Sequence, residues 1–421
     1  MSTPRRDFVK TLGFMMGAAV FPGKSDLLAQ TASVFQGNAN DNPDFWMWIQ
    51  QAYTTNPNII NLNNGGVSPQ PKIVQEAFER YYRLCNEGPS YYMWRILDQG
   101  REPLRAKLAL QAGCSPEEIV INRNTTEALD TVIFGLTLNK GDEIVLSRYD
   151  YPNVINAWKQ REMRDGVKIV WIDLPVPIED DEKIVDAYSS AFTSRTRIVN
   201  ITHMINWSGQ LLPARKIADA AHKKGIEVIV DGAHTFAHLD YKISDLDCDY
   251  FGTSLHKWLC APFGTGMLFM KKDKIKNIYP LFPNPEPRSE DIRKFEAQGT
   301  RSFPAEQAVG EAINFQMNIG NKRKEERLRF LKNYWAEQAI KIPRVKLNTS
   351  LKPEFSCALA NFSIDGMKAS EIDAELFNKY KIHTVGIVWE KIDGIRVTPH
   401  VYTRLSDLDK LVEAISNIAK K

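Results

Sequence analysis

Apolar runs that alternate with helical segments constrain the fold of this chain most. One of the helical segments, PARKIADAAHKKG, opens with Pro213 and closes with Gly225, which is the expected chemistry of helix boundaries. Repeated alternation of this kind predicts a mostly parallel sheet that is covered by helices on both faces. The runs that we interpret as its buried strands are EEIVIN, EIVLSRYDYPN, VKIVWIDLP, RTRIVNITHM, IEVIVDGAH, DYFGTSLHK and GTGMLFMKK.

A proline-rich stretch, PLFPNPEPRSED, ends this pattern and marks the exit from the first large domain. Beyond it, strand-like and helical segments describe a smaller α+β domain. A chain of 421 residues with 43% hydrophobic residues has enough apolar surface for two cores. We therefore expect an arm at 33–66, a large domain at 67–285 and a small C-terminal domain at 286–421.

Two charged residues stand at the ends of neighbouring strands in the large domain. Asp231 ends the apolar run Val228–Val230, and Lys257 follows one unit later within TSLHKWLCAPFGTGMLF. In an open α/β sheet, ligands bind at the carboxyl ends of the strands. A desolvated lysine can form a Schiff base with an aldehyde, and a fixed carboxylate can pair with a pyridinium nitrogen, as pyridoxal phosphate requires. Each residue alone has a simpler interpretation, a turn former for Asp231 and a surface lysine for Lys257.

The segment NRNTTEALD predicts a strand that ends directly before a helix. The free backbone N–H groups and the helix dipole at such a turn suit a phosphate. Thr125 could equally serve as a plain N-cap, with Glu127 in the first turn. Gly264 and Gly266, which follow Lys257, would let backbone approach a ligand closely.

Taken in order, these residues resemble the class V aminotransferase family of fold-type I pyridoxal-phosphate enzymes, and within it the isopenicillin N epimerase-like branch. The resemblance runs from about Asn61 to the C-terminus. It implies a large domain with a mostly parallel seven-stranded sheet and a smaller α+β domain. It also implies a homodimer with a shared active site.

The resemblance assigns roles to further residues. Those that it implies for cofactor binding are Thr125, Thr126, Tyr151, Asn206, Asp231, His234, Ser254, His256, Lys257 and Thr300. Tyr151 stands where relatives have a ring-stacking histidine, and Thr300 matches the residue that reaches the phosphate of the neighbouring subunit. The resemblance implies that Arg396 binds the substrate carboxylate, with Asn64 and Gly65 close by. Arg396 could also form a structural salt bridge, and His234 could only cap its strand.

The predicted function is catalysis on an amino acid, in which Lys257 holds the cofactor as an aldimine and then moves protons at the α-carbon while Asp231 keeps the pyridinium protonated. Transamination, epimerisation and β-lyase chemistry share this first half, so the sequence leaves them open. A non-catalytic binding relative is the remaining alternative. The stretch KIHTVGIVWEKIDGIRV contains no cysteine, which argues against a cysteine desulfurase.

The first residues read as an export signal. Arg5 and Arg6 precede a short apolar run that is too short to span a bilayer, which is typical of a twin-arginine signal. We expect a signal peptide at 1–32, the twin-arginine translocase as a partner, and a periplasmic or otherwise exported protein. A start region that is not used for export is the alternative.

Composition argues against several classes of binding partner and site. The net charge of +3, without a basic stripe, argues against a nucleic-acid binder. The run NKRKEERLRF alternates in sign and predicts the solvated face of a helix. Five cysteines without paired spacing indicate neither a disulfide framework nor a metal motif, and Cys248 and Cys260 are expected to be small buried apolar residues.

Overall fold

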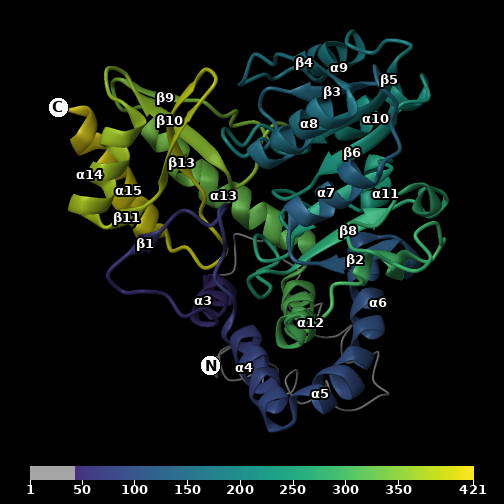
Figure 1. Ribbon diagram of the computed structural model, residues 1–421. Helices are drawn as coiled ribbons and strands as arrows, with labels where there is room; N and C mark the ends of the chain where they lie inside the picture. The colour runs from purple at the N-terminus through teal and green to yellow at the C-terminus, as the bar shows by residue number, and fades with distance from the viewer. Residues whose placement is uncertain (1–42) are drawn as a thin grey trace. The chain divides into compact units, whose positions relative to one another are not determined.

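The computed structural model describes residues 43–421, so the predicted signal peptide and the first part of the predicted arm lie outside the described residues. Its larger sheet has seven strands in the order β2-β8-β7-β6-β5-β3-β4 (Figure 1). Strand β8 runs in the opposite direction to the other six strands of this sheet. This confirms the predicted fold class. The strands are β2 (Ile119–Asn122), β3 (Glu143–Ser147), β4 (Lys168–Ile172), β5 (Thr196–Thr202), β6 (Glu227–Asp231), β7 (Tyr250–Ser254) and β8 (Gly266–Met270).

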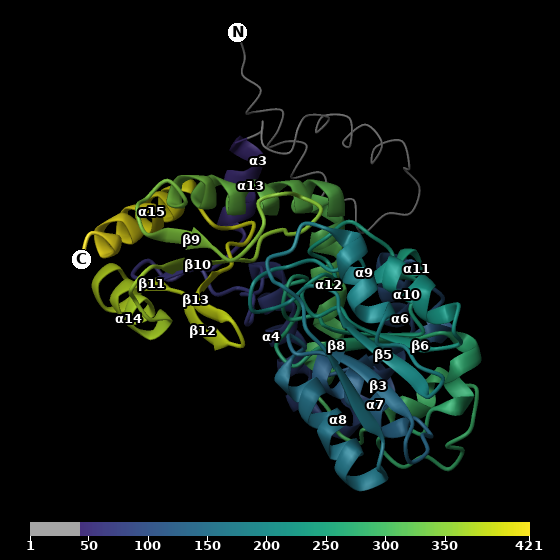
Figure 2. The same cartoon turned by 90° about the horizontal axis from the view of Figure 1, so that it is seen from above.

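Helices cover both faces of this sheet because neighbouring residues of a strand point to opposite sides. Figure 2 shows α7 (Thr125–Gly135) and α8 (Pro152–Asp165) on one side and α9 (Asp181–Ser189), α10 (Ala214–His222) and α11 (Ile243–Leu246) on the other. Along β2, Val120 packs with α7 and α8, whereas Ile119 and Ile121 pack with the opposite layer. Buried apolar residues on both faces explain why the strands read as continuous hydrophobic runs.

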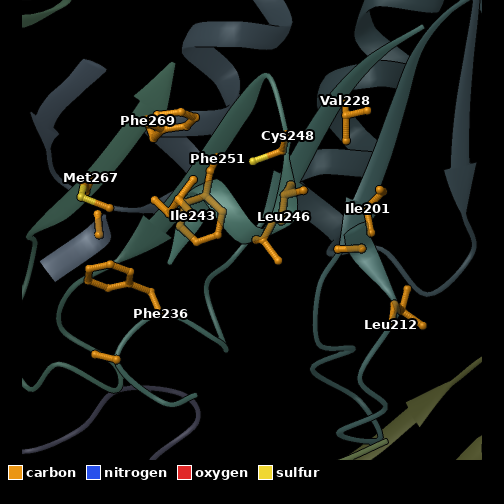
Figure 3. Packing of buried hydrophobic residues seen from close by; sticks show 14 of the residues in the cluster. Ile201, Leu212, Val228, Phe236, Ile243, Leu246, Cys248, Phe251, Met267 and Phe269 are labelled. Carbon is orange, nitrogen blue, oxygen red and sulfur yellow. The ribbon is translucent and has the colours of Figure 1, made fainter. Parts of the chain in front are cut away.

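The core on the second face includes aromatic and sulfur-containing side chains (Figure 3). Phe251, Met267 and Phe269 of the sheet lie with Ile243 and Leu246 of α11 and with Cys248. The five cysteines are free thiols, and Cys114 alone among them is not fully buried. Cys248 therefore behaves as the predicted small apolar residue.

The smaller sheet has the order β12-β13-β10-β9, with every neighbouring pair antiparallel. A separate hydrophobic cluster fills the space between this sheet and its helices. The strands and helices of this region are β9 (Val345–Leu347), β10 (Ala360–Ile364), β11 (Ile382–His383), β12 (Val385–Trp389), β13 (Ile392–Val397), α13 (Asn321–Ala339), α14 (Ala369–Tyr380) and α15 (Leu405–Ala419).

The remaining elements connect these two regions. Strand β1 (Ile60–Asn61) pairs with β11, so this early strand belongs to the small region. Helix α12 (Phe303–Ile319) packs against α4 and α6, which belong to the large region, and the boundary at 285/286 stays a prediction. The other elements are α3 (Pro43–Gln51), α4 (Lys72–Glu87), α5 (Pro89–Tyr91), a π-helix (Tyr92–Ile96), α6 (Arg101–Ala112), and the 3-10 helices Leu97–Gly100, Pro116–Glu118, Lys272–Asn277 and Ile292–Glu296. Within residues 43–421, each helix is too short or too polar to cross a membrane.

The prediction of a solvated face for the charged run from Asn321 is wrong in part. The run is helical, as α13, but Lys324 and Arg327 are buried. The Lys324 ammonium donates hydrogen bonds to the carbonyl oxygen of Trp258 and to Gln316 Oε1, the latter at 2.8 Å. Carbonyl oxygens thus replace water around a charge that sequence patterning assigned to the surface.

Candidate active site

Lys257 lies in the turn between β7 and β8, at the carboxyl edge of the large sheet. Its side chain is only partly exposed, and Nζ lies 3.3 Å from Nε2 of His234. Burial lowers the pKa of Lys257 to about 8, Asp231 acts in the opposite direction, and Arg396 adds to the lowering. A substantial fraction of the amine is therefore neutral near physiological pH, which a lysine nucleophile requires.

Asp231 is the last residue of β6 and is buried. Its Oδ1 accepts a hydrogen bond from the backbone N–H of Ala233 at 2.9 Å. Burial raises the pKa of Asp231, while the Ala233 N–H and Lys257 oppose the rise. The carboxyl and the amine influence each other's protonation, so the fold brings these two residues close together.

The N-terminus of α7 is joined to the lysine turn by Ser254. The Thr125 N–H donates to Ser254 Oγ at 2.9 Å, and the two hydroxyl oxygens lie 2.7 Å apart. The helix cap is Asn124, whose Oδ1 accepts from the Glu127 N–H at 2.9 Å, so the alternative of Thr125 as the N-cap is wrong. The Thr125 hydroxyl, bonded to Ser254, thus lies in the first turn of the helix, where anions are favoured.

Thr126 and His256 flank this pair. The Thr126 hydroxyl accepts a hydrogen bond from Asn153 Nδ2 at 3.2 Å. His256 Nδ1 donates to the carbonyl oxygen of Thr265 at 3.0 Å, and burial lowers the pKa of His256 to about 4, so the ring is neutral. A Cβ on Gly266 would lie 2.5 Å from the Asn124 nitrogen. This glycine therefore lets β8 approach the turn before α7.

Arg396 on β13 reaches across to the large region. Nη1 donates to the carbonyl oxygen of Asn206 at 3.1 Å, and Nη2 donates to Asn63 Oδ1 at 3.0 Å. Burial lowers the pKa of Arg396 to about 10, and the phenol of Tyr151 acts in the opposite direction. Within residues 43–421 no carboxylate forms an ion pair with this guanidinium, so the alternative of a structural salt bridge finds no partner there. A buried guanidinium in that state favours an anionic ligand.

The turn from Asn63 to Gly66 borders the site. The residue of this turn that contacts Arg396 is not the one that the sequence analysis selected. Asn64 is fully buried; its Nδ2 donates to the Thr398 carbonyl at 2.8 Å and its Oδ1 accepts from the Tyr402 hydroxyl at 2.6 Å. Asn63, which the sequence analysis did not select, contacts Arg396 instead. A Cβ on Gly65 would lie 2.9 Å from Thr398 Cγ2 and 3.6 Å from His234 Cε1, so this glycine permits close packing on His234.

Three buried polar atoms around Arg396 have no hydrogen-bond partner in the described part of the chain. They are Asn206 Oδ1, His234 Nδ1 and Arg396 Nε. Burial lowers the pKa of His234 well below its usual range, with Lys257, Arg396 and His238 adding to the effect, so this ring is neutral. Buried polar atoms without partners are costly, and a bound polar ligand is one way to satisfy them.

Tyr151 and Thr300 are the more exposed residues of the predicted site. Tyr151 precedes α8 and is 38% exposed, and its phenol acts to raise the pKa of Arg396. Thr300 lies exposed after Gly299, which adopts a positive φ of 67°. Because its predicted role involves a second subunit, that role stays a prediction.

These residues fit pyridoxal phosphate on chemical grounds. An amine of lowered pKa would hold an aldehyde, and a buried carboxyl with one hydrogen bond within residues 43–421 would hold a ring nitrogen. A helix N-terminus with hydroxyls would hold a phosphate, and an arginine without an ion-pair partner in the described residues would hold a substrate carboxylate. The structure does not assign Thr300 to this set.

Comparison with known proteins identifies the family. Residues 60–386 match the family described as Aminotransferase class-V, and the chain belongs to it. The chain is 28% identical to the isopenicillin N epimerase of Amycolatopsis lactamdurans over 396 residues, which cover 89% of this chain and 99% of that protein. It is 28% identical to a probable cysteine desulfurase of Synechocystis over 333 residues, covering 75% and 78% of the two chains.

A solved structure shares the fold. A lysine-to-alanine mutant of C-DES with glycine covalently linked to the PLP cofactor aligns with a TM-score of 0.79 at 22% identity, covering 86% of this chain and 97% of that chain. The family membership supports the predicted cofactor, whereas the names of the relatives differ in the reaction that they describe.

Proposed function

We propose that this protein is a pyridoxal-phosphate-dependent enzyme that acts on the α-carbon of an amino acid, with Lys257 as its covalent attachment site. One observation carries the proposal: the Lys257 amine, which lies 3.3 Å from His234, has its pKa lowered to about 8 by burial, and a buried carboxyl and a buried arginine that has no acidic partner in residues 43–421 both act on it. The cofactor, when bound, supplies an electron sink that stabilises negative charge at the substrate α-carbon.

The protein's own residues bind, orient and exchange protons. Arg396 binds the substrate carboxylate through its planar fork, with Asn63 and the Asn206 carbonyl fixing its orientation. Lys257 takes and returns a proton at the α-carbon, because its Nζ is neutral in part at physiological pH. With pyridoxal phosphate bound, Asp231 would hold positive charge at the ring nitrogen, and Thr125 with Ser254 would hold the phosphate at the start of α7.

Among the reactions that share this chemistry, we favour proton transfer at the α-carbon, as in an epimerase. Support comes from the relative with nearly complete coverage, an isopenicillin N epimerase. Cysteine desulfuration is less consistent with the chain. The hairpin β12–β13, which includes Arg396, carries no cysteine, and Cys260 and Cys357 are both buried.

An absorption spectrum tests the cofactor and the lysine together. We expect the purified protein with added pyridoxal phosphate to show a visible band that borohydride abolishes, and Lys257→Ala to lack it. Lys332→Ala is a matched control, because Lys332 on α13 is a buried lysine whose pKa burial likewise lowers to about 8 and whose ammonium bonds Ser356 rather than the site. A native protein that stays colourless would contradict the proposal.

Hydrogen exchange separates the reactions. In heavy water, an epimerase exchanges the α-proton of its substrate without any keto acid, whereas a transaminase needs a keto acid to complete turnover. A lyase releases a fragment of the side chain, which chromatography detects. Exchange that depends on an added keto acid would replace the epimerase assignment with a transaminase.

We also propose a homodimer in which Thr300 completes the neighbouring phosphate site. Its exposed position after Gly299 supports this arrangement. Mixed dimers of Lys257→Ala and Thr300→Ala subunits provide the test. One of their two sites would combine an intact Lys257 with an intact Thr300, so mixing should restore cofactor affinity that both parent variants lack. Two independent sites per dimer would show no such recovery.

We further propose export through the twin-arginine pathway, on the basis of Arg5 and Arg6 in the sequence. Replacing both residues by lysine should leave the protein in the cytoplasmic fraction of the cells that make it. Unchanged fractionation of the double variant would contradict export by this route.

A further inference from the structure

The turn that precedes Tyr151 is built around a buried acid, Asp150. Its backbone N–H donates to the Ser147 carbonyl, and its Oδ2 accepts from the Ser147 N–H, both at 3.1 Å. The side chain thus closes the turn that follows β3. Asp150 has no measurable exposure, so this carboxyl is held by the protein alone.

Strand β5 holds the same carboxyl from the other side. The Thr202 hydroxyl donates to Asp150 Oδ1 at 2.7 Å, and Asn200 Nδ2 lies 3.4 Å from Oδ2. Thr202 is also the residue that pairs with Asp231 in the parallel register of β5 and β6. Asp150 therefore connects the Tyr151 turn to the strand that lies beside the proposed cofactor carboxylate.

A third tether comes from the small region. Trp389 at the end of β12 donates its indole N–H to the carbonyl oxygen of Arg148 in the same turn, at 2.9 Å. Its ring stacks on Trp207, with centroids 4.9 Å apart, and Trp207 follows Asn206. The turn is thus held to strand β5 by Asp150 and to strand β12 by Trp389.

The surroundings of Asp150 are compatible with a protonated carboxyl group. Asn200 Oδ1 and the Tyr188 hydroxyl are buried without hydrogen-bond partners in the described chain. The titratable groups that face the carboxyl are Asp231 on β6 and Tyr188 on α9. Burial raises the pKa of Asp150 to about 7, and Asp231 adds to the rise, while Thr202, Ser147 and Asn200 act in the opposite direction.

We propose that Asp150 is a positioning residue of this site, which fixes the turn that precedes Tyr151 through its hydrogen bonds and places its own charge close to Asp231, across strand β5. The inference rests on the proposed function, because Asp231 must hold the cofactor ring for the charge to act on it. Above neutral pH the charged Asp150 favours positive charge at the ring and at the lysine linkage. Below neutral pH this contribution is lost.

The chain offers a matched control at the other end of the same strand. Asp142 closes an equivalent turn: its Oδ2 accepts from the Asn139 N–H at 2.7 Å, and its N–H donates to the Asn139 carbonyl at 3.0 Å. Asp142 lies before β3, at the amino edge of the sheet. Asp142→Asn therefore repeats the change in turn chemistry away from the site.

Infrared difference spectra of the full protein without cofactor test the protonation. We expect the carboxylic acid absorption that is lost between about pH 6 and about pH 8 to be smaller by one carboxyl group in Asp150→Asn than in the native protein and in Asp142→Asn, since burial also raises the pKa of Asp130 and of Asp231. Thr202→Val should move the midpoint of the Asp150 contribution to higher pH, because it removes a hydroxyl that stabilises the charged form. An equal loss of absorption in Asp150→Asn and in the native protein would overturn the assignment.

The visible spectrum after addition of pyridoxal phosphate tests the effect on the site. Loss of the negative charge in Asp150→Asn should lower the pH midpoint of the lysine-linked band by about one unit, whereas Asp142→Asn should leave it in place. An unchanged midpoint in Asp150→Asn would overturn the positioning role. If the native protein binds no pyridoxal phosphate, the proposed function fails, while the infrared result still reports on Asp150.

Discussion

The two ends of the candidate site differ in how far the protein satisfies its own polar groups. At the start of α7, Thr125 and Ser254 bond to each other, and Asn124 caps the helix. Around Arg396, the polar atoms Arg396 Nε, Asn206 Oδ1 and His234 Nδ1 have no partner within residues 43–421. The phosphate end is thus assembled in advance, and the substrate end depends on a ligand to compensate its buried groups.

This difference predicts its largest effect at Arg396. In Arg396→Met, kcat/KM for α-proton exchange should fall about 10³-fold, because truncating a buried charge partner costs about 2–5 kcal/mol. The unfolding temperature should stay the same or rise, since the variant removes a buried charge without a counter-ion. The amino acid that exchanges fastest in the native protein serves as the probe. A variant that retains exchange or melts earlier would place Arg396 among the structural residues.

Substitutions at the phosphate end, at the start of α7, should have a smaller effect on the reaction than Arg396→Met. Ser254→Ala removes one hydroxyl, so the Kd for pyridoxal phosphate should rise about tenfold, equivalent to about 1.4 kcal/mol. The exchange rate at saturating cofactor should change less than about threefold. Thr131→Val is the matched control, because it removes a buried hydroxyl from the second turn of the same helix, where Thr131 donates to the Glu127 carbonyl. Equal losses in both variants would show a general effect on α7.

Gly65 tests how tightly the open end is packed. In Gly65→Ala the new methyl would lie 2.9 Å from Thr398 Cγ2, so we expect a loss of about 1–2 kcal/mol in the free energy of unfolding. Gly66→Ala is its neighbour control, since its methyl would meet nothing closer than 3.5 Å. Chemical denaturation measures both. Equal stability of the two variants would mean that this turn moves to accommodate a side chain.

Strand patterning predicted the fold because burial on both faces leaves a clear signal. The runs that end at Asp231 and Ser254 are β6 and β7, and the βα alternation gives the parallel sheet. The same logic placed Lys257 beside Asp231, since the carboxyl ends of neighbouring parallel strands share one edge. These contacts follow from periodicity and from topology.

Other contacts depend on packing between distant segments. Asn63 reaches Arg396 across 333 positions, and no periodic pattern distinguishes it from Asn64 beside it. The burial of Lys324 depends on the carbonyl of Trp258, which only the folded chain brings to α13. Thr125 and Asn124 are both acceptable N-caps, and backbone geometry decides in favour of Asn124. The roles of Thr300 and of the first residues stay predictions.

The smallest expected effect links the two ends through charge. The rate at which pyridoxal phosphate attaches to Lys257 should rise with pH up to about 8 and level off above it, because only the neutral amine reacts. Arg396→Met removes a positive charge that lowers the pKa of Lys257, so the inflection should move up by about half a unit. Lys346→Met, at the exposed position of β9, should leave it in place. An inflection that ignores Arg396 would mean that the two ends of the site act independently.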